Sequence, residues 1–152
     1  IGLFMKAVIQ RVAGASVTIK RKEYSSIRSG ILVFLGIEKG DTHADADHIL
    51  DKTIHLRIFE DAERKMNLSL LDIQGEMLIV SQFTLLADTG RGRRPSFAQA
   101  EEPRRARELY EYFIREAEKK LKKVQSGIFQ EAMQVALVND GPVTILLNSK
   151  KG

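Results

Sequence analysis

The sequence predicts a single α/β domain with a mixed sheet and two main helices. The chain has 152 residues, the length of one ordinary domain that can bury its own core. Apolar runs typical of buried strands occur in both halves of the chain, and two further segments carry apolar residues at helical spacing. No motif recurs at a fixed period, so a repeat architecture is not expected.

The first half of the chain predicts the beginning of the sheet and one helix. Strands are expected at Met5–Val12, Ser16–Lys20 and Ile31–Ile37. Gly14 separates the first two of these strands. Thr42 can cap a helix from about His43 to Leu56, because a threonine hydroxyl accepts a hydrogen bond from the first helical turn. A short extended piece is then expected at Leu56–Phe59.

The second half contains the clearest helix and further strands. A buried strand is expected at Met77–Val80, and Pro103 opens a helix that Ser126-Gly127 ends. The apolar residues of this helix recur every three or four positions and predict a core-facing stripe: Ala106, Leu109, Tyr110, Phe113, Ala117 and Leu121. The last section predicts two strands, Met133–Val138 and Val143–Leu147. A hairpin turn at Gly141-Pro142 joins them, because glycine and proline are typical turn residues.

The composition excludes several classes of protein. Cysteine is absent, which excludes thiol catalysis, disulfide bonds and cysteine-ligated zinc, and is compatible with a reducing cytoplasm. No apolar run approaches the roughly 18 residues that indicate a membrane span. We therefore expect a cytoplasmic protein that does not enter a membrane.

The net charge of +4 is unevenly distributed. Basic residues gather in two groups: Arg91, Arg93, Arg94, Arg104, Arg105 and Arg107, followed by Lys119, Lys120, Lys122 and Lys123. Such clusters can neutralise phosphates, which suits an RNA ligand. Glu116 and Glu118 dilute the lysine group, so we interpret it as a solvated helix face. The arginines at 91–94 are candidates for contact with RNA, with a solvated loop as the alternative.

The usual catalytic arrangements of hydrolases are absent. Ser81 does not lie in a G-x-S-x-G motif and has no evident histidine partner. The three histidines lie in one predicted helical segment and are not expected to converge on zinc. A phosphate-binding glycine loop is also absent. We therefore expect neither a metal nor a cofactor. Thr84 is the natural candidate for a nucleophile, although no base stands near it in the sequence.

Two motifs together resemble a known family. Ser81-Gln82-Phe83-Thr84-Leu85 continues to Asp88 as "SQFTLLAD", and residues 139–144 read "NDGPVT". These are similar to the two signatures of the D-aminoacyl-tRNA deacylases, the D-tyrosyl-tRNA(Tyr) deacylase family. The resemblance extends from Met5 nearly to the end of the chain. Residues 1–4 precede it and are expected to be an expression remnant or an upstream extension, with 5–152 as the deacylase domain.

The resemblance implies both a fold and an activity. The family fold is a single domain of layered β-sheets with two main helices packed on one side, and it forms a homodimer whose active site lies at the subunit interface. The implied reaction is hydrolysis of the ester bond of D-aminoacyl-tRNA to free tRNA and a D-amino acid, a proofreading step of translation. Glycyl-tRNA is an expected second substrate, and no cofactor is implied.

The resemblance also implies roles for particular residues. Ser81 and Gln82 would hold the terminal adenosine, while the main chain at Phe83 and Thr84 would face the scissile carbonyl. The terminal 2′-hydroxyl of the tRNA would assist the attack. Gly141-Pro142, as a cis pair, would reach into the partner subunit's pocket and exclude L-aminoacyl groups. Arg11, Asn139 and Thr144 would support the Gly-Pro pair. Arg91, Arg93 and Arg94 would contact the tRNA backbone.

The sequence departs from the family pattern at Phe129-Gln130-Glu131-Ala132-Met133, where glycine and alanine more often follow the phenylalanine. This segment is expected near the adenine pocket, so the longer Gln130 and Glu131 side chains alter how the terminal base is bound.

Two other functions stay open at this point. One is a non-catalytic RNA-binding module, and the other is an ester hydrolase with Thr84 as its nucleophile.

Overall fold

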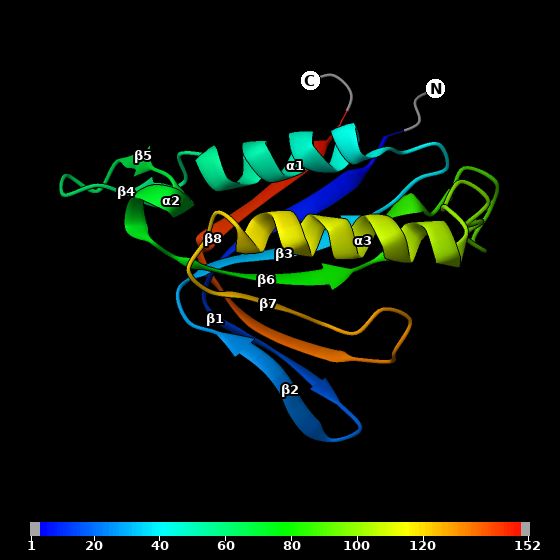
Figure 1. Ribbon diagram of the computed structural model, residues 1–152, viewed down its shortest axis with the longest axis horizontal. Coiled ribbons are helices and arrows are strands. Elements are labelled where there is room, and N and C mark those ends of the chain that lie inside the picture. Colours follow the sequence, from blue (N-terminus) through cyan, green and yellow to red (C-terminus); the bar gives the residue numbers. More distant parts are fainter. Residues whose placement is uncertain (1–3, 150–152) are drawn as a thin grey trace.

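The computed structural model describes residues 4–149 and shows a strongly bent sheet with two long helices on one side (Figure 1). Its elements in chain order are β1 (Lys6–Ile19), β2 (Lys22–Ile27), β3 (Gly30–Gly36), α1 (His43–His55), β4 (Phe59–Glu60), β5 (Met66–Leu68), α2 (Leu70–Ile73), β6 (Glu76–Ser81), the 3₁₀ turn η1 (Phe83–Leu86), α3 (Pro103–Glu118), β7 (Val124–Ser126) and β8 (Gln134–Asn148). The predicted mixed α/β architecture is confirmed. Of the residues expected to precede the domain, 1–3 lie outside the described residues.

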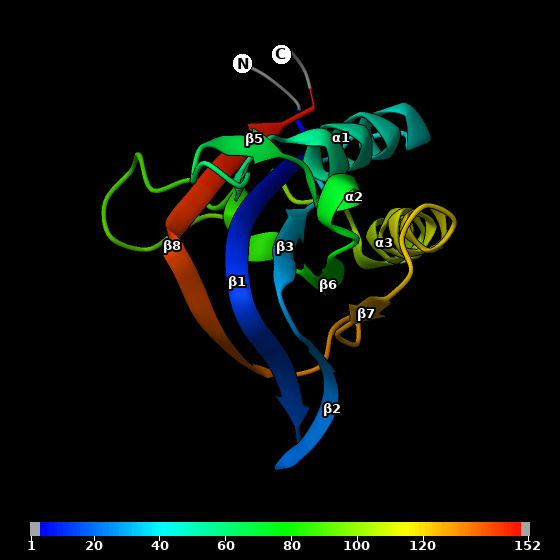
Figure 2. The same ribbon diagram turned by 90° about the vertical axis from the view of Figure 1, so that its left-hand side faces the viewer.

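The long strand β1 organises the sheet. Its first part pairs with β3 and its last part with β2, while β8 runs antiparallel along almost its whole length. Strands β3, β6 and β7 continue the sheet in parallel. Figure 2 shows β1 and β8 curving together down one side of the molecule. Within residues 4–149, β8 pairs with β1 and with no other strand, so it forms an edge of the sheet.

Strand β1 corrects the prediction of two strands separated at Gly14. Gly14 lies inside one continuous strand and pairs with Val138 of β8. The register of the pairing between β1 and β8 shifts on both sides of Val12. Strand β1 continues through these shifts and does not end there. Strands β2 and β7 were not predicted, because their polar sequences lack the apolar alternation that marks a strand.

Strand β8 corrects the predicted hairpin. The Gly141–Pro142 peptide bond is cis, as the resemblance implies, but it lies within one strand that runs on past it. Asn139 pairs with Val12 and Thr144 with Gln10, so four residues of β8, 140–143, lie opposite the single residue Arg11. The Gly-Pro pair therefore forms a bulge in an edge strand, where proline's missing N–H leaves no gap in the ladder.

Helix α1 begins where the sequence predicts. The Asp45 carboxylate accepts a hydrogen bond from the Thr42 N–H at 2.8 Å, which closes a capping box at the first turn. Helix α3 ends at Glu118, earlier than the predicted end at Ser126-Gly127. The reason is that Val124–Ser126 pairs with β6 and is held as strand β7. The predicted extended piece after α1 reaches a strand only at Phe59, which pairs with Leu68.

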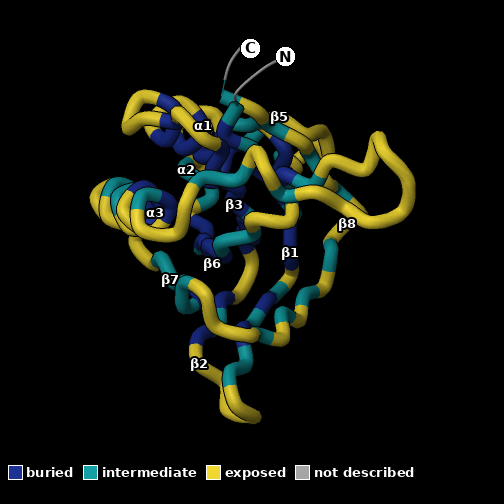
Figure 3. Tube along the Cα trace, turned by 90° about the vertical axis from the view of Figure 1, so that its right-hand side faces the viewer, coloured by how far each residue is buried: buried dark blue, intermediate teal, exposed yellow. Residues whose placement is uncertain are grey.

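One core cluster lies between the two long helices and the sheet (Figure 3), and a second is formed by strand residues that include Val17, Leu32 and Leu78. The predicted stripe of α3 is buried in the first cluster, and Leu121 beyond the helix end is buried with it. Ile31, Val33, Met77 and Ile79 of the two central strands contribute to the same core. This packing fixes the end of β6 relative to α3. Within residues 4–149, no helix is long and apolar enough to cross a membrane.

Candidate functional site

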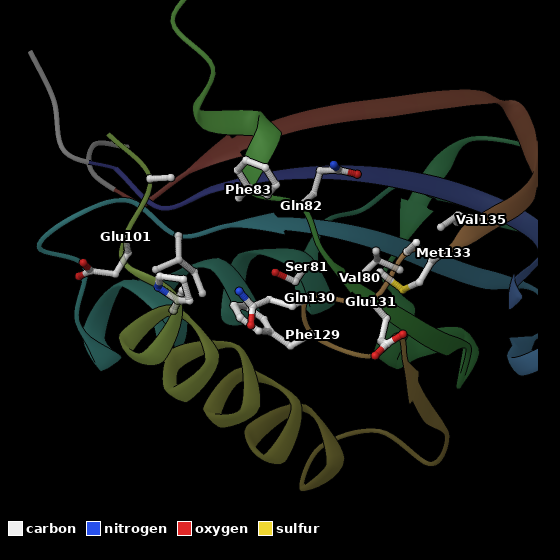
Figure 4. A pocket seen from close by; sticks show the side chains of 15 residues that line it. Val80, Ser81, Gln82, Phe83, Glu101, Phe129, Gln130, Glu131, Met133 and Val135 are labelled. Atoms are coloured by element: carbon white, nitrogen blue, oxygen red, sulfur yellow. The ribbon is translucent and has the colours of Figure 1, made fainter. Parts of the chain in front are cut away.

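A cavity of about 670 Å³ lies where β6 ends, beside the first turn of α3 and the segment that joins β7 to β8 (Figure 4). Its walls are formed by Ile37, Val80, Ser81, Gln82, Phe83, Ala100, Glu101, Pro103, Ala106, Phe129, Gln130, Glu131, Ala132, Met133 and Val135. Hydroxyl and amide groups therefore stand among apolar and aromatic side chains, an arrangement typical of a small-molecule or nucleotide pocket.

The end of β6 forms one wall of this cavity. The Gln82 N–H donates to the Leu35 carbonyl at 2.8 Å, which is the last hydrogen bond of the chain to the sheet before it turns into η1. The Phe83 ring is 56% exposed and meets the Phe97 ring edge-to-face at 5.0 Å between centroids. Three predicted site residues, Ser81, Gln82 and Phe83, are thus brought together on the cavity wall.

Thr84 lies next to this wall but does not line the cavity among the described residues. Its hydroxyl oxygen accepts a short hydrogen bond from the Gln82 amide. The first hydrogen bond of η1 runs from the Leu85 N–H to the Gln82 carbonyl. The N–H groups of Phe83 and Thr84 precede that bond, and within residues 4–149 neither donates to another main-chain group outside the regular elements, so they are available as donors.

The opposite wall is aromatic. The Phe129 ring lies 5.9 Å from the Tyr110 ring, and the Arg107 guanidinium lies 5.5 Å from the Phe129 centroid. The Tyr110 hydroxyl is within hydrogen-bonding distance of two carbonyls, Ile79 at 3.0 Å and Gly127 at 3.1 Å, to which it donates. Burial raises the pKa of Tyr110, so this donor keeps its proton. The sequence marked Tyr110 only as a core residue and placed Arg107 in the first basic group, without indicating its contact with Phe129.

The departure from the family pattern falls on the rim of the cavity. Gln130 and Glu131 both line it, as expected from the sequence. Gln130 has φ of 67°, the left-handed conformation that glycine adopts most easily. The backbone therefore keeps a shape suited to glycine, while the chain places a long amide side chain at that position.

The buried side chain of Arg11 contacts the Gly-Pro bulge. Its guanidinium donates to the Asp140 carbonyl at 2.9 Å and to the Ile58 carbonyl at 2.7 Å. A Cβ atom on Gly141 would lie 2.8 Å from an Arg11 nitrogen, and the φ of Gly141 is +128°. Only glycine meets both conditions without displacement. The predicted supporting position of Arg11 thus contacts the bulge directly.

Asn139 and Thr144 close the bulge from its two ends. The Asn139 side-chain oxygen accepts from the Val143 N–H at 3.0 Å, and its amide donates to the Thr144 hydroxyl at 3.0 Å. That hydroxyl donates in turn to the Gln10 side chain at 2.8 Å. The bulge itself is exposed, and neither of its two central residues, Gly141 and Pro142, lines the cavity within the described chain.

Comparison with known proteins identifies the family. The model of the D-Tyr-tRNA(Tyr) deacylase family matches residues 8–148. The chain belongs to the D-Tyr-tRNA(Tyr) deacylase family. A relative from Syntrophus aciditrophicus, named D-aminoacyl-tRNA deacylase, is 60% identical over 97% of this chain and 99% of its own length. A relative of the same name from Thermosipho melanesiensis is 52% identical over 97% of this chain and 99% of its own length.

Two solved structures have a similar fold. A structure named c-Myc DNA Unwinding Element Binding Protein has a TM-score of 0.91 at 41% identity, covering 96% of this chain and 99% of the other. A structure described as a probable eukaryotic D-amino acid tRNA deacylase has a TM-score of 0.82 at 17% identity, covering 95% of this chain and 99% of the other. At that identity, the second likeness shows the fold alone.

In this member of the deacylase family, the predicted arginine contacts lie on an exposed loop between η1 and α3. Backbone hydrogen bonds of 2.8 and 2.9 Å between Asp88 and Ser96 close the base of the loop. Arg91, Arg93 and Arg94 are exposed at its tip, and none forms an ion pair within residues 4–149. Their charges are thus available to a ligand.

The histidines of the deacylase chain do not form a metal site in the structure. The His43 ring stacks on Tyr112 at 4.1 Å between centroids, and His55 lies 3.3 Å from the Asp51 carboxylate. Over the part of the chain that the structure describes, no three or more histidine or carboxylate side chains are grouped so that they could hold a metal ion.

Proposed function

We propose that the protein hydrolyses the ester bond of D-aminoacyl-tRNA, releasing free tRNA and a D-amino acid, with glycyl-tRNA as a further substrate. The observation that carries this proposal is the cavity at Ser81–Phe83 in a chain whose relatives, at up to 60% identity, are named D-aminoacyl-tRNA deacylases. The reaction takes place in the cytoplasm, where aminoacyl-tRNA is used.

The cavity is suited to the terminal adenosine of tRNA. The hydroxyl of Ser81 and the amide of Gln82 offer hydrogen bonds to the ribose and the base. The face of Phe129 supplies an aromatic platform, and a base stacked on an aromatic ring gains about 1–3 kcal/mol. Binding of this kind holds the ester without a contact to the amino-acid side chain.

The chemical step needs little from the protein's side chains. An aminoacyl ester is already activated, and the neighbouring 2′-hydroxyl of the ribose stands in position to assist the attack. The free N–H groups of Phe83 and Thr84 would donate to the oxyanion as it forms, which is the largest single contribution in many acyl transfers. Thr84 itself acts through its main chain and through its contact with Gln82.

Chiral selection is assigned to the Gly141-Pro142 bulge of a partner subunit. A rigid main chain beside the α-carbon would collide with an L side chain but leave space for a D side chain, and glycine would pass because it has none. The support is that Gly141 and Pro142 are exposed, held by Arg11, and outside the cavity of their own chain. A homodimer brings one chain's bulge to the other chain's cavity.

The test is deacylation of purified charged tRNA. We expect D-tyrosyl-tRNA to be hydrolysed at least 100-fold faster than L-tyrosyl-tRNA, since steric exclusion of one isomer costs it about 3 kcal/mol or more in the transition state. A tRNA that ends in 2′-deoxyadenosine should lose most of this activity. Hydrolysis of the D-ester no faster than in buffer would reject the function, and full turnover of the 2′-deoxy substrate would reject RNA assistance.

The same assay separates the alternatives. A non-catalytic RNA-binding module would bind tRNA and leave the ester intact. The name of one similar structure states binding to a DNA element for that protein. An ester hydrolase with Thr84 as nucleophile would cleave simple amino-acid esters and would not need the 2′-hydroxyl.

A further inference from the structure

A second cavity of about 250 Å³ lies next to the first. It is lined by Thr18, Lys20, Arg21, Ala132, Met133 and Gln134. Ala132 and Met133 line both cavities, so the two are separated only by this short segment. A chain that fills the first cavity and leaves past Met133 therefore enters the second.

The second cavity is built at the tip of the β1–β2 hairpin. Lys20 and Arg21 have φ of 51° and 68°, so both residues of the two-residue turn are left-handed. This is the geometry of a turn that normally selects asparagine and glycine, and long basic side chains are unusual there. Unfavourable backbone positions of this kind are retained most often where the side chain has a function.

The charge of the hairpin tip is not neutralised within the described residues. Lys20, Arg21 and Lys22 are consecutive and exposed, and none forms an ion pair in residues 4–149. The cavity lining adds the Thr18 hydroxyl and the Gln134 amide, which lie on paired positions of β1 and β8. Two cations, a hydroxyl and an amide are the groups that bind a phosphodiester and its ribose.

Two carboxylate residues lie close in sequence to the residues that line the second cavity. Glu23 follows the hairpin tip, and Glu131 lines the first cavity just before the shared segment. Neither lines the second cavity. Glu23 pairs with Thr18 of the cavity lining, so it offsets one of the three cations at Lys20–Lys22 and leaves the hairpin side positive. A phosphate is therefore favoured on the hairpin side of Met133 and disfavoured beside Glu131, which sets the direction in which a bound strand leaves the first cavity.

We propose that the second cavity and the tip Lys20–Lys22 bind the phosphates of the unpaired nucleotides that precede the terminal adenosine of tRNA. The proposal rests on the proposed function, because it takes the first cavity as the site of that adenosine. It assigns the single-stranded 3′ end to the hairpin. The arginine loop at 91–94 is left to contact another part of the tRNA.

The test compares two substrates in a variant with Lys20→Gln, Arg21→Gln and Lys22→Gln. We expect KM for D-tyrosyl-tRNA to rise about tenfold or more at low salt, with kcat unchanged. The salt dependence of log KM should weaken by about 0.7 for each phosphate that the variant no longer neutralises, about 2 in total. D-tyrosyl-adenosine carries no phosphate, so its hydrolysis should be unaffected.

A matched variant controls for net charge. Lys119→Gln, Lys120→Gln and Lys122→Gln remove the same charge at the far end of α3, away from both cavities (Figure 1). This variant should keep KM for D-tyrosyl-tRNA within about twofold of the original value. Thermal unfolding checks that both variants fold, and single substitutions at Lys20 and Arg21 replace the triple variant if it does not.

Unchanged KM and salt dependence in the hairpin variant, or an equal loss on D-tyrosyl-adenosine, would overturn the proposal while the deacylase function stood. Absence of D-specific hydrolysis in the unmodified protein would instead reject the proposed function. Binding of uncharged tRNA to the same variants would then decide the hairpin's role. Weaker binding in the hairpin variant alone supports it, and equal binding in all three proteins overturns it.

Discussion

Gly141 combines a backbone conformation that favours glycine with close contacts that leave no space for a side chain. Its φ of +128° lies where L residues are rare, and the Arg11 guanidinium and the Val143 main chain fill the space that a side chain would need. Thr84 is the contrasting case, an exposed hydroxyl whose contact in the structure is an amide rather than a base. The two residues lead to opposite expectations on substitution.

Gly141→Ala should weaken chiral selection. The added methyl group would lie 2.8 Å from an Arg11 nitrogen and 3.2 Å from the Val143 nitrogen, so the bulge must shift. We expect the ratio of kcat/KM for D- over L-tyrosyl-tRNA to fall at least tenfold, equal to about 1.4 kcal/mol of discrimination. Gly92→Ala is the matched control, because Gly92 also has positive φ, +94°, with nothing within 4 Å of the added carbon. An unchanged ratio in Gly141→Ala would remove the bulge from the selection step.

Thr84→Ala should retain most of the deacylase activity. Among the described residues, the side-chain contact of the Thr84 hydroxyl is the Gln82 amide and not a general base. Loss of the hydroxyl should therefore cost less than about tenfold in kcat, through freer motion of the Gln82 side chain. Single-turnover hydrolysis of D-tyrosyl-tRNA measures this directly. A fall to the uncatalysed rate, with recovery in Thr84→Ser, would establish Thr84 as the nucleophile instead.

At the scale of elements, the sequence predicted a helix or strand correctly where its residue pattern is typical of one kind of structure. The stripe of α3 and the Thr42 cap of α1 followed from spacing and residue type, and both are found as expected. Gly141-Pro142 was wrongly interpreted as a hairpin, because a hairpin turn and a bulge in a long strand use the same residues. The choice depends on β1, which pairs with β8 on both sides of the bulge and lies over 120 positions earlier in the sequence.

The candidate site, too, could be predicted from the sequence only in part. The wall at Ser81–Phe83 could be predicted because polar residues follow directly after an apolar strand. The opposite wall could not, since Arg107 and Phe129 meet only through the packing of α3 against the segment after β7. Nor does any local pattern show that Arg11 joins the Asp140 and Ile58 carbonyls. The roles of all these residues in the reaction stay predictions.

Tyr110→Phe tests how α3 fixes the cavity. The substitution removes the hydroxyl donor that the Ile79 and Gly127 carbonyls share. Ile79 still accepts from the Gly127 N–H, but the Gly127 carbonyl loses this donor, and a buried acceptor left without a partner costs about 1–3 kcal/mol. We expect a lower free energy of unfolding and a higher KM for D-tyrosyl-tRNA, measured by denaturant titration and by kinetics. Tyr112→Phe is the control, because its hydroxyl donates to the exposed Asp47 carboxylate and should matter less. Equal effects of the two substitutions would contradict this role of Tyr110.

At the scale of the whole molecule, the chain has an edge strand with apolar residues on its exposed face. Val138 and Leu146 of β8 are 62% and 76% exposed, on either side of the Gly-Pro bulge. Exposed apolar residues on an unpaired edge favour association with another chain. An interface there would cover these side chains and carry the bulge toward a second subunit, as the proposed homodimer requires.

Leu146→Glu should dissociate the proposed homodimer and abolish D-tyrosyl-tRNA hydrolysis together, because a charge would be buried in the interface. Sedimentation of the original protein should give twice the mass of one chain, and that of the variant a single chain. Met66→Glu changes an apolar residue that is 52% exposed outside β8 and should affect neither property. A fully active monomer would refute a shared active site.

Arg11 connects stretches of backbone that are about eighty residues apart in sequence. One guanidinium donates hydrogen bonds to the carbonyls of both Ile58 and Asp140, so the shape of the bulge depends on the segment that follows α1. If the bulge selects the D isomer as proposed, a substitution in that segment would change the selection without altering a residue of the cavity. The proposed selection of the D isomer would therefore also depend on a backbone segment that does not line the cavity within the described residues.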